Sequence, residues 1–207
     1  MRRSKEEAAE TIRQLIDIAR SHFTEHGYAG AALESIVHEA KLTRGAVYHH
    51  FRNKKELFRS VLEAVQKEVA DRVEREAAAS EDVWQQLYLG CRAFVTAAVE
   101  ERNKRIMLID GPAILGWEAW RAMDENHSMR LLRGQLETMQ RQGVIGPAPL
   151  DAMTHFLSGA LNETTLWLAH ESARTAALEE AMEAVGFFME GFKRQAERAT
   201  GKIEPAG

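Results

Sequence analysis

The chain has 207 residues, enough for one or two domains with a sizeable core. Hydrophobic residues at 45% and charged residues at 28% exclude a disordered chain, and the lack of any apolar run near 18 residues excludes a membrane-spanning helix. A net charge of −4 excludes a protein that coats nucleic acid over its whole surface.

The first predicted element is an amphipathic helix that begins near Ser4 and ends at Gly27. Ser4 and Glu7 have the spacing of a capping box, and a left-handed glycine is a common helix terminator. Apolar residues recur with helical spacing and predict one buried face: Ile12, Leu15, Ile16, Ala19 and Phe23.

Residues 33–51 predict two short helices joined by a tight turn. The turn is residues 41–43, in which Leu42 is expected to be a buried plug and Thr43 to cap the second helix through its hydroxyl. One face of the first helix is apolar: Leu33, Ile36, Val37 and Ala40.

The second of these helices, Arg44 to about His50, is too short to be stable alone and must be held by packing. Val47 and Phe51 are its predicted anchors, and His50 is expected at the core-facing edge. The opposite face carries side chains that suit a DNA major groove: Arg44, Gly45, Tyr48 and His49. This pattern is typical of a helix-turn-helix with a recognition helix.

A long helix is predicted next, from Asn53 to about Ala77, with Glu56 placed to complete the cap that Asn53 begins. Lys54 and Lys55 stand in its first turn, where the helix dipole disfavours cations. Free backbone N–H groups beside a lysine form an anion site, so Lys54 is predicted to bind a DNA phosphate. Lys55 fits that role and plain solvation equally well.

These residues resemble the N-terminal domain of the TetR family of bacterial transcriptional regulators. The resemblance runs from about Ile12 to Phe58, and two features depart from it. Ala31 and Ala32 stand where the family has Thr or Ser before the second helix, and Lys41 stands where it has a small residue or Gly. The matching positions are Phe23, Gly27, Tyr28, Ile36, Gly45, Tyr48, His50, Phe51, Lys54, Leu57 and Phe58.

The resemblance implies a DNA-binding domain at residues 1–52 and a helical ligand-binding and dimerisation domain at 53–200. The sequence after Thr200 predicts a disordered tail at 201–207. Charge agrees with this division. Residues 1–60 carry 11 Lys and Arg against 8 Asp and Glu, a net of +3, whereas residues 61–207 carry 16 against 23, a net of −7. The predicted DNA contacts are Thr43, Arg44, Gly45, Tyr48, His49, Lys54 and Lys55.

The remaining chain also predicts helices, because it has few prolines and no strand-like alternation, so the expected fold class is all-α. After a connector at residues 77–80 comes a helix that is apolar on two sides, which indicates a central position. A short helix at about 105–109 is expected to stop at Gly111 and Pro112. The later predicted helices are residues 116–142, 150–168 and 175–192, with a loop at 143–149.

The last two helices carry apolar residues beyond one face, which predicts a seam between two chains. A helix-turn-helix also needs a partner to bind a palindrome, so we expect a homodimer closed by four helices. A thick bundle within one chain is the alternative. The predicted interface residues are Leu157, Leu161, Thr164, Leu168, Met182, Val185, Phe188 and Phe192.

The resemblance further implies a small-molecule pocket that controls DNA binding. The aromatic side chains available for it fit an ordinary core equally well, and Asn162 and Glu163 equally fit polar pairs in a dimer interface. The predicted pocket residues are Trp84, Tyr88, Met107, Trp117, Trp120, Phe156, Asn162, Glu163 and Trp167.

No catalytic motif, metal site or cofactor site is recognisable in the sequence. His49 and His50 are neighbours on a helix and point apart, so they do not predict a zinc site. Cys91, the only cysteine, is expected to be a buried apolar side chain, and a reducing cytoplasm is expected. The charged residues after Arg3 do not resemble a signal peptide.

The sequence therefore predicts a homodimeric repressor that binds a near-palindromic operator in double-stranded DNA and is released by a small apolar or amphipathic effector. Glu163 would favour a cationic or hydrogen-bond-donating effector. The alternative is an all-α protein that sequesters small molecules without binding an operator, and an enzyme on this scaffold is a remote third.

Overall fold

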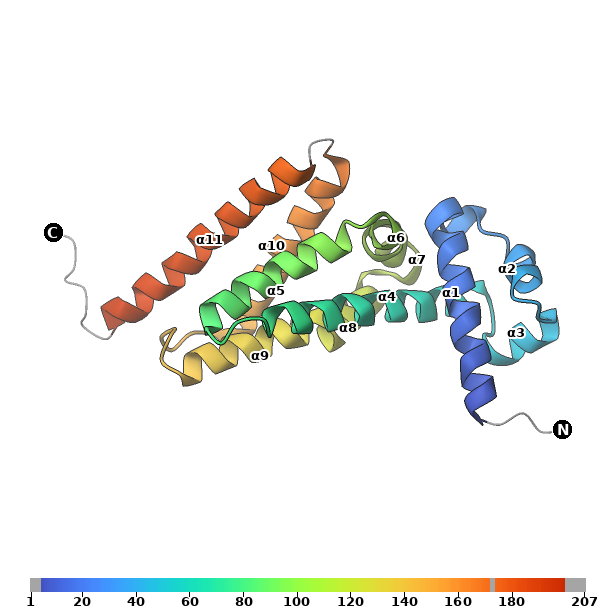
Figure 1. Ribbon diagram of the computed structural model, residues 1–207, viewed down its shortest axis with the longest axis horizontal. Coiled ribbons are helices and arrows are strands. Elements are labelled where there is room, and N and C mark those ends of the chain that lie inside the picture. Colours follow the sequence, from blue (N-terminus) through green and yellow to red (C-terminus); the bar gives the residue numbers. More distant parts are fainter. Residues whose placement is uncertain (1–4, 172–173, 200–207) are drawn as a thin grey trace. The chain divides into compact units, whose positions relative to one another are not determined.

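The computed structural model describes residues 5–171 and 174–199, and within these ranges the chain forms helices and no strand (Figure 1). The all-α prediction is confirmed, whereas the predicted Ser4 cap and the predicted tail lie outside the described residues. The helices are α1 (Lys5–Gly30), α2 (Leu33–Glu39), α3 (Arg44–His50), α4 (Lys54–Ala77), α5 (Val83–Ala98), α6 (Glu101–Lys104), the π-helix η1 (Arg105–Asp110), α7 (Gly111–Leu115), α8 (Trp117–Asn126), α9 (Ser128–Arg141), α10 (Leu150–His170) and α11 (Arg174–Ala199).

The chain folds as two compact units that are each made of two separate segments. Unit 1 consists of Met1–Glu68 and Glu100–Met123, and unit 2 consists of Val69–Val99 and Asp124–Gly207. This division differs from a boundary at residue 52, because the first part of α4 and the segment from α6 to α8 join the N-terminal helices.

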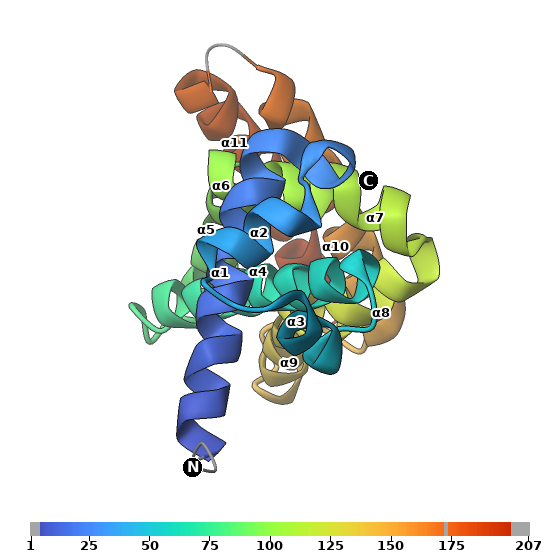
Figure 2. The same cartoon turned by 90° about the vertical axis from the view of Figure 1, so that its right-hand side faces the viewer.

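The core of unit 1 is built on α1, with α2 packed against it and α3 against α2 (Figure 2). Leu15, Ala19 and Phe23 are buried as predicted, whereas Ile12 and Ile16 are half-buried. The Phe23 ring meets the edge of the Phe58 ring from α4, with centroids 5.1 Å apart.

The helix α4 begins as the sequence predicts. Asn53 Oδ1 accepts the Glu56 backbone N–H at 2.9 Å, which satisfies one free donor of the first turn. An apolar stripe of α4 is buried along the helix: Phe58, Leu62, Val65, Val69 and Val73. The last two of these belong to unit 2, so a single helix contributes to both cores.

The helix predicted at residues 105–109 is longer than expected and continues through Pro112. It starts as α6, widens into the π-helix η1 and ends as α7. The stop predicted at Gly111 and Pro112 is wrong, because Pro112 lies in the first turn of α7, where a missing N–H is tolerated.

The π-helical register leaves one backbone carbonyl without a backbone donor, and Trp120 supplies a donor from its side chain. Gly111 N–H donates to the Ile106 carbonyl, five residues back, so the next donor in this register would be residue 112, a proline. The Met107 carbonyl instead accepts a hydrogen bond from Trp120 Nε1 at 2.7 Å. A Cβ on Gly111 would lie 2.8 Å from the Ile106 oxygen and 2.9 Å from Trp120 Cδ1, so this position requires glycine.

A bend in α1 brings η1 into contact with the N-terminal helices. The bend is at Gly27, where φ is +69°, so the predicted helix end is present, followed by a short turn to Gly30. A Cβ on Gly27 would overlap Arg105 Nη2, so the guanidinium occupies that space. Asp110 Oδ2 accepts the Tyr28 backbone N–H at 2.9 Å and lies 3.6 Å from Arg105 Nε.

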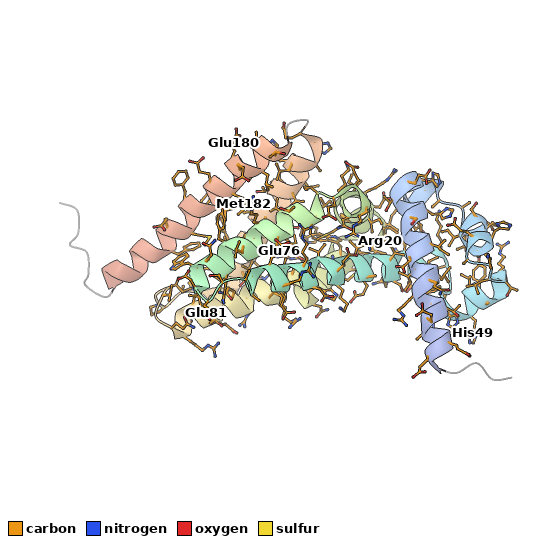
Figure 3. All side chains as sticks on the ribbon, in the orientation of Figure 1. Arg20, His49, Glu76, Glu81, Glu180 and Met182 are labelled. Atoms are coloured by element: carbon orange, nitrogen blue, oxygen red, sulfur yellow. The ribbon has the colours of Figure 1, made fainter. Side chains whose placement is uncertain are left out.

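A group of polar side chains joins α1, α4 and α6. Arg20, labelled in Figure 3, donates to Glu68 Oε2 at 2.5 Å and to Asn103 Oδ1 at 2.6 Å. Arg102 also pairs with Glu68, and Thr24 Oγ1 donates to the Arg102 carbonyl at 3.3 Å. Because Asn103 is only 1% exposed, these contacts are partly sealed from water and hold residues 100–110 to the N-terminal helices.

Unit 2 is built around α5, which packs against α9, α10 and α11. Asp82 Oδ1 caps α5 by accepting the Gln85 N–H at 2.8 Å. One apolar stripe of α5 is buried: Val83, Leu87, Cys91, Phe94 and Ala98. Among the described residues, no helix is long and apolar enough to cross a membrane.

The long helix predicted at residues 116–142 is two helices. The break is at His127, whose φ of −117° and ψ of −103° are not helical. The apolar spacing of α9 predicts that Met129, Leu132, Leu136 and Met139 face inward; Leu132 is half-buried and the other three are buried.

Candidate nucleic-acid interface and small-molecule pocket

The turn between α2 and α3 is a Schellman motif with lysine at the left-handed position. Leu42 N–H donates to the Val37 carbonyl at 3.2 Å, and Lys41 N–H to the His38 carbonyl at 3.0 Å. Lys41 has a φ of +53°, which costs a residue with a Cβ about 1–2 kcal/mol relative to glycine. Leu42 is half-buried, so it is less buried than the sequence predicts.

The short helix α3 has the bounds that the sequence predicts. Thr43 Oγ1 accepts the Ala46 N–H at 3.1 Å, which caps the helix. Val47 and Phe51 are 1% and 8% exposed, so they anchor the inner face. At the start of α2, Ala32 provides no side-chain cap, as its residue type dictates.

The outer face of α3 is polar and exposed, and its arginine is held by two neighbours. Arg44, Gly45, Tyr48 and His49 are all exposed. The Arg44 guanidinium carbon lies 5.6 Å from the centre of the Tyr48 ring, and its Nη2 lies 3.4 Å from Glu34 Oε1. Contacts with Tyr48 and then Glu34 raise the pKa of Arg44, so it carries a permanent positive charge.

The two lysines of α4 differ in their surroundings. Lys54 Nζ lies 4.6 Å from the centre of the Tyr28 ring and is half-buried, whereas Lys55 is exposed. Burial lowers the pKa of Lys54, and the Glu34 carboxylate opposes that shift. Lys54 is therefore a positioned cation at a helix start.

His50 is exposed rather than packed at the core edge as predicted, because α3 ends there and the chain turns before Phe51. Its ring lies 5.2 Å from the ring of His49, which is labelled in Figure 3. In the described part of the chain, no group of His, Cys, Asp and Glu side chains is arranged to hold a metal ion.

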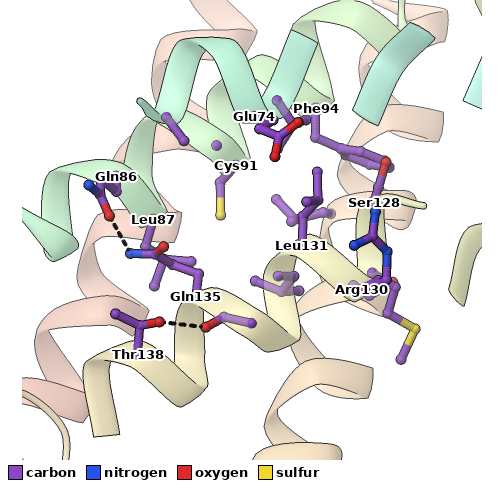
Figure 4. Close-up of a pocket in the computed structure, with 18 of the residues that line it drawn as sticks. Glu74, Gln86, Leu87, Cys91, Phe94, Ser128, Arg130, Leu131, Gln135 and Thr138 are labelled. Atoms are coloured by element: carbon purple, nitrogen blue, oxygen red, sulfur yellow. Dashed lines mark hydrogen bonds between the residues drawn. The ribbon is translucent and has the colours of Figure 1, made fainter. Parts of the chain in front are cut away.

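A cavity of about 400 Å³ lies within unit 2. Figure 4 shows Cys91 and Phe94 of α5 facing Leu131 and Gln135 of α9 across it. Its wall is mostly apolar: Val73, Ala77, Ala78, Leu87, Gly90, Cys91, Phe94, Met129, Leu131, Leu132, Gly134 and Leu161. Its size and lining fit a small apolar or amphipathic molecule.

Eight polar residues also line this pocket. Gln135 Nε2 donates to Gln86 Oε1 at 3.1 Å, and Ser158 Oγ donates to Asp124 Oδ2 at 3.3 Å. Ser128 Oγ is buried and has no hydrogen-bond partner among the described residues. The remaining polar lining is Glu74, Arg130 and Thr138.

Cys91 is buried, as predicted, and lies in the pocket wall. Burial raises the pKa of its thiol to about 12, so the side chain is an uncharged, weakly reactive group at neutral pH.

None of the nine side chains predicted for the pocket is in its wall. Met107 and Trp120 are buried in unit 1, and Trp84 and Tyr88 are half-buried on α5. Trp117, Phe156, Glu163 and Trp167 are exposed, and the amide of Asn162 is buried without a hydrogen-bond partner in the described residues. A usable signal was the small residues on facing helices, Ala77, Gly90, Cys91 and Gly134, which leave space where larger side chains would fill a core.

The residues predicted for the dimer seam differ in their burial within one chain. Leu157, Leu161, Leu168 and Met182 are at most 6% exposed within one chain, so they pack inside it and offer no surface to a partner. Thr164, Val185 and Phe192 are half-buried, and Phe188 is 56% exposed. The exposed aromatic residues of α10 and α11 are Phe156, Trp167, Phe187 and Phe188, and we call this set the aromatic face.

The capped recognition helix with a cationic outer face defines a helix-turn-helix protein. Residues 15–61 match the family described as bacterial regulatory proteins, tetR family, and residues 84–192 match the Tetracyclin repressor-like C-terminal domain. The chain belongs to the TetR family of transcriptional regulators.

Similar proteins agree with this assignment. A TetR-family transcriptional regulator from Pectobacterium atrosepticum is 33% identical, with a TM-score of 0.76 over 92% of this chain and 97% of that one. The HTH-type transcriptional regulator TtgR of Pseudomonas putida is 36% identical over 112 residues, 51% of each chain. The HTH-type transcriptional repressor BepR of Brucella suis is 42% identical over 62 residues, 30% of each chain. The matched region thus spans about half the length of TtgR and less than a third of BepR.

Proposed function

We propose that this regulator is a repressor that binds a near-palindromic operator as a homodimer and leaves the DNA when a small effector enters the pocket of unit 2. The observation that carries the proposal is the outer face of α3. A short, capped helix that is anchored on one side and cationic on the other has the properties that insertion into a major groove requires.

Each residue of this face has a role that follows from its chemistry. Arg44 would read a guanine through two hydrogen bonds, and Gly45 would let the helix approach the bases closely. Tyr48 and His49 would contact phosphate or a thymine methyl group. Thr43 at the helix start, with Lys54 and Lys55 on α4, would bind backbone phosphates, as the resemblance implies.

The aromatic face of α10 and α11 supports a homodimer. Phe156 and Phe188 pack edge to face, with centroids 6.1 Å apart, and both remain more than half exposed. Aromatic residues grouped in this way are costly in water and are typical of protein interfaces. A homodimer that binds a palindrome must place its two recognition helices in grooves one helical turn apart, about 34–36 Å.

The effector would act through α4, because this one helix carries Lys54 near its start and pocket residues Val73 and Glu74 near its end. A bound molecule that shifts α4 would change how Lys54 meets a phosphate. An effector can shift the protein from its DNA-binding conformer to another that differs by a few kcal/mol, provided that it binds the second conformer more tightly by at least that amount. The apolar wall favours an apolar or amphipathic effector, and the charges that face it belong to Glu74, Asp124 and Arg130 rather than to Glu163.

The first experiment is selection of preferred sequences from a randomised duplex library. We expect an inverted repeat whose half-sites are about 34–36 Å apart, bound at least ~1,000-fold more tightly than a scrambled duplex. A chain that retains no duplex above its salt-dependent background would instead be a sequestering protein.

The second experiment tests release. Native mass spectrometry of the purified protein would identify a co-purified small molecule, which is then titrated into the operator complex. Operator should weaken effector affinity by the same factor by which the effector weakens operator affinity. Gly90→Leu, which fills the pocket beside Val73 and Ala77, should keep operator binding and lose the response.

A further inference from the structure

The Glu34 carboxylate lies beside Arg44 and acts electrostatically on Lys54, two of the three cations proposed to contact DNA. It stands in the first turn of α2, with its Oε1 3.4 Å from Arg44 Nη2 on α3. The side chains of Glu34 and Arg44 are 65% and 64% exposed, so both are available to a ligand that covers this surface.

Arg44 is held on its other side by an aromatic ring. Its guanidinium carbon is 5.6 Å from the centre of the Tyr48 ring, one helical turn along α3. A guanidinium that contacts both a carboxylate and a ring is oriented before it meets DNA, and a phosphate competes with Glu34 for it.

The same carboxylate acts on Lys54. The Glu34 charge raises the pKa of Lys54 against the lowering effect of burial, and it also raises the pKa of Arg44. Two cations that differ in role, one suited to a base and one to a phosphate, therefore share one negative neighbour.

This arrangement affects operator and non-specific DNA differently. Phosphates are present in every duplex, so a carboxylate beside them weakens binding to all sequences. A guanine in the correct position gives Arg44 two directed hydrogen bonds, which offset the lost Glu34 contact. A phosphate can also bind a guanidinium through two hydrogen bonds, but it is anionic and the nearby Glu34 carboxylate repels it, whereas a guanine is neutral.

We propose that Glu34 is a specificity-determining residue, which restrains Arg44 and disfavours binding to DNA that offers Arg44 phosphates but no matching base. This inference rests on the proposed operator binding. The glutamate itself touches neither base nor phosphate and acts through Arg44 and the local charge.

The chain supplies a matched control in Glu39. It lies on the same helix, is also exposed, and contacts His22 Nε2 at 2.8 Å instead of a cation of the α3 face. Glu34→Gln and Glu39→Gln remove the same charge from the same helix, so any general effect of net charge is common to both. Glu34 also suits the positive end of α2, and a loss of that effect would lower thermal stability without changing the ratio of affinities.

The experiment measures fluorescence anisotropy of the selected operator and of a scrambled duplex over a series of salt concentrations, for the full chain and both variants. Glu34→Gln should tighten binding to the scrambled duplex by about two- to fivefold, the range of an exposed charge pair, and operator binding by less. Its salt slope on the scrambled duplex should steepen by up to about one unit. Glu39→Gln should change the ratio of the two affinities by less than about twofold.

The role of Arg44 is tested by repeating the comparison in the Arg44→Ala background, where Glu34→Gln should no longer change the ratio. If Glu34→Gln leaves the ratio of operator to scrambled-duplex affinity unchanged in the protein that keeps Arg44, the inference is overturned while the proposed operator binding stands. An equal change of that ratio by Glu39→Gln has the same consequence. A persistent change in the Arg44→Ala background also overturns it. If the wild-type chain prefers no duplex, the proposed function fails, and this inference fails with it.

Discussion

The contact between Trp120 and the Met107 carbonyl allows a stability prediction that separates one hydrogen bond from its surroundings. Trp120→Phe keeps an aromatic ring in the site but removes the indole N–H that donates at 2.7 Å. Met107 is fully buried, so water cannot replace the donor. An unsatisfied buried acceptor costs about 1–3 kcal/mol, and the smaller ring adds a cavity term.

The two costs are separated by Pro112→Ala, which restores a backbone N–H at the position whose π-helical acceptor is Met107. The cavity term is the same in both backgrounds, whereas the unsatisfied carbonyl is present only when residue 112 is proline. Trp120→Phe should therefore cost about 1–2 kcal/mol less in the Pro112→Ala background than in the wild-type background.

The assay is urea denaturation of the four proteins, followed by far-ultraviolet circular dichroism, because tryptophan fluorescence changes with the mutation itself. Equal costs in the two backgrounds, within about 0.3 kcal/mol, would show that Trp120 contributes packing alone and that the Met107 carbonyl has another donor.

Three further predictions concern the interface, the assembly and the pocket. Arg44→Ala should weaken operator binding by about 1–3 kcal/mol and relax the preference at one base pair. Lys54→Ala should instead weaken binding to all duplexes alike and reduce the salt slope by about one. An unchanged slope in a salt titration of Lys54→Ala contradicts the phosphate site. Phe188→Asp places a charge in the aromatic face, so sedimentation should detect monomers without specific DNA binding, and a wild-type monomer that binds the operator would rule out the dimer. Because the thiol pKa of Cys91 is raised from 9.0 to about 12, the unfolded state ionises first, and stability should fall between pH 9 and 12 by up to about 1.4 kcal/mol per pH unit. Cys91→Ser should remove that dependence in denaturation curves recorded across this range, and a fall of equal size in the variant would assign it to other groups.

The helix-turn-helix was predictable because its determinants are local. The spacing of Val47 and Phe51, the cap at Thr43 and the outward set on α3 all lie within ten residues, where periodicity leaves little freedom. The positive φ of Lys41 occurs at the position where the family that the sequence resembles has a small residue or glycine.

The pocket and the inward face of α10 were not predictable in the same way. Leu157 and Phe156 are neighbours in an apolar helix, and only the packing of α5 and α9 decides that Leu157 is buried and Phe156 exposed. A cavity depends on which small residues of different helices face one another, and this pairing cannot be deduced from the sequence of any one helix. The π-helical register of η1 and the break at His127 change hydrogen bonding without interrupting the apolar pattern.

The discontinuity of unit 1 limits how such regulators can exchange their DNA-binding heads by recombination. A crossover within α4 would take Arg20 from one parent and Asn103, 83 residues later, from the other, and would separate Tyr28 from Asp110 in the same way. A working chimera must inherit residues 100–123 together with residues 1–68, which takes crossovers after residues 68, 99 and 123 instead of a single one. The part of the chain that must be inherited together is therefore unit 1 as a folded unit. Substitutions at Asn103 or Asp110 alter the DNA-binding unit although they lie far from the helix-turn-helix in the gene.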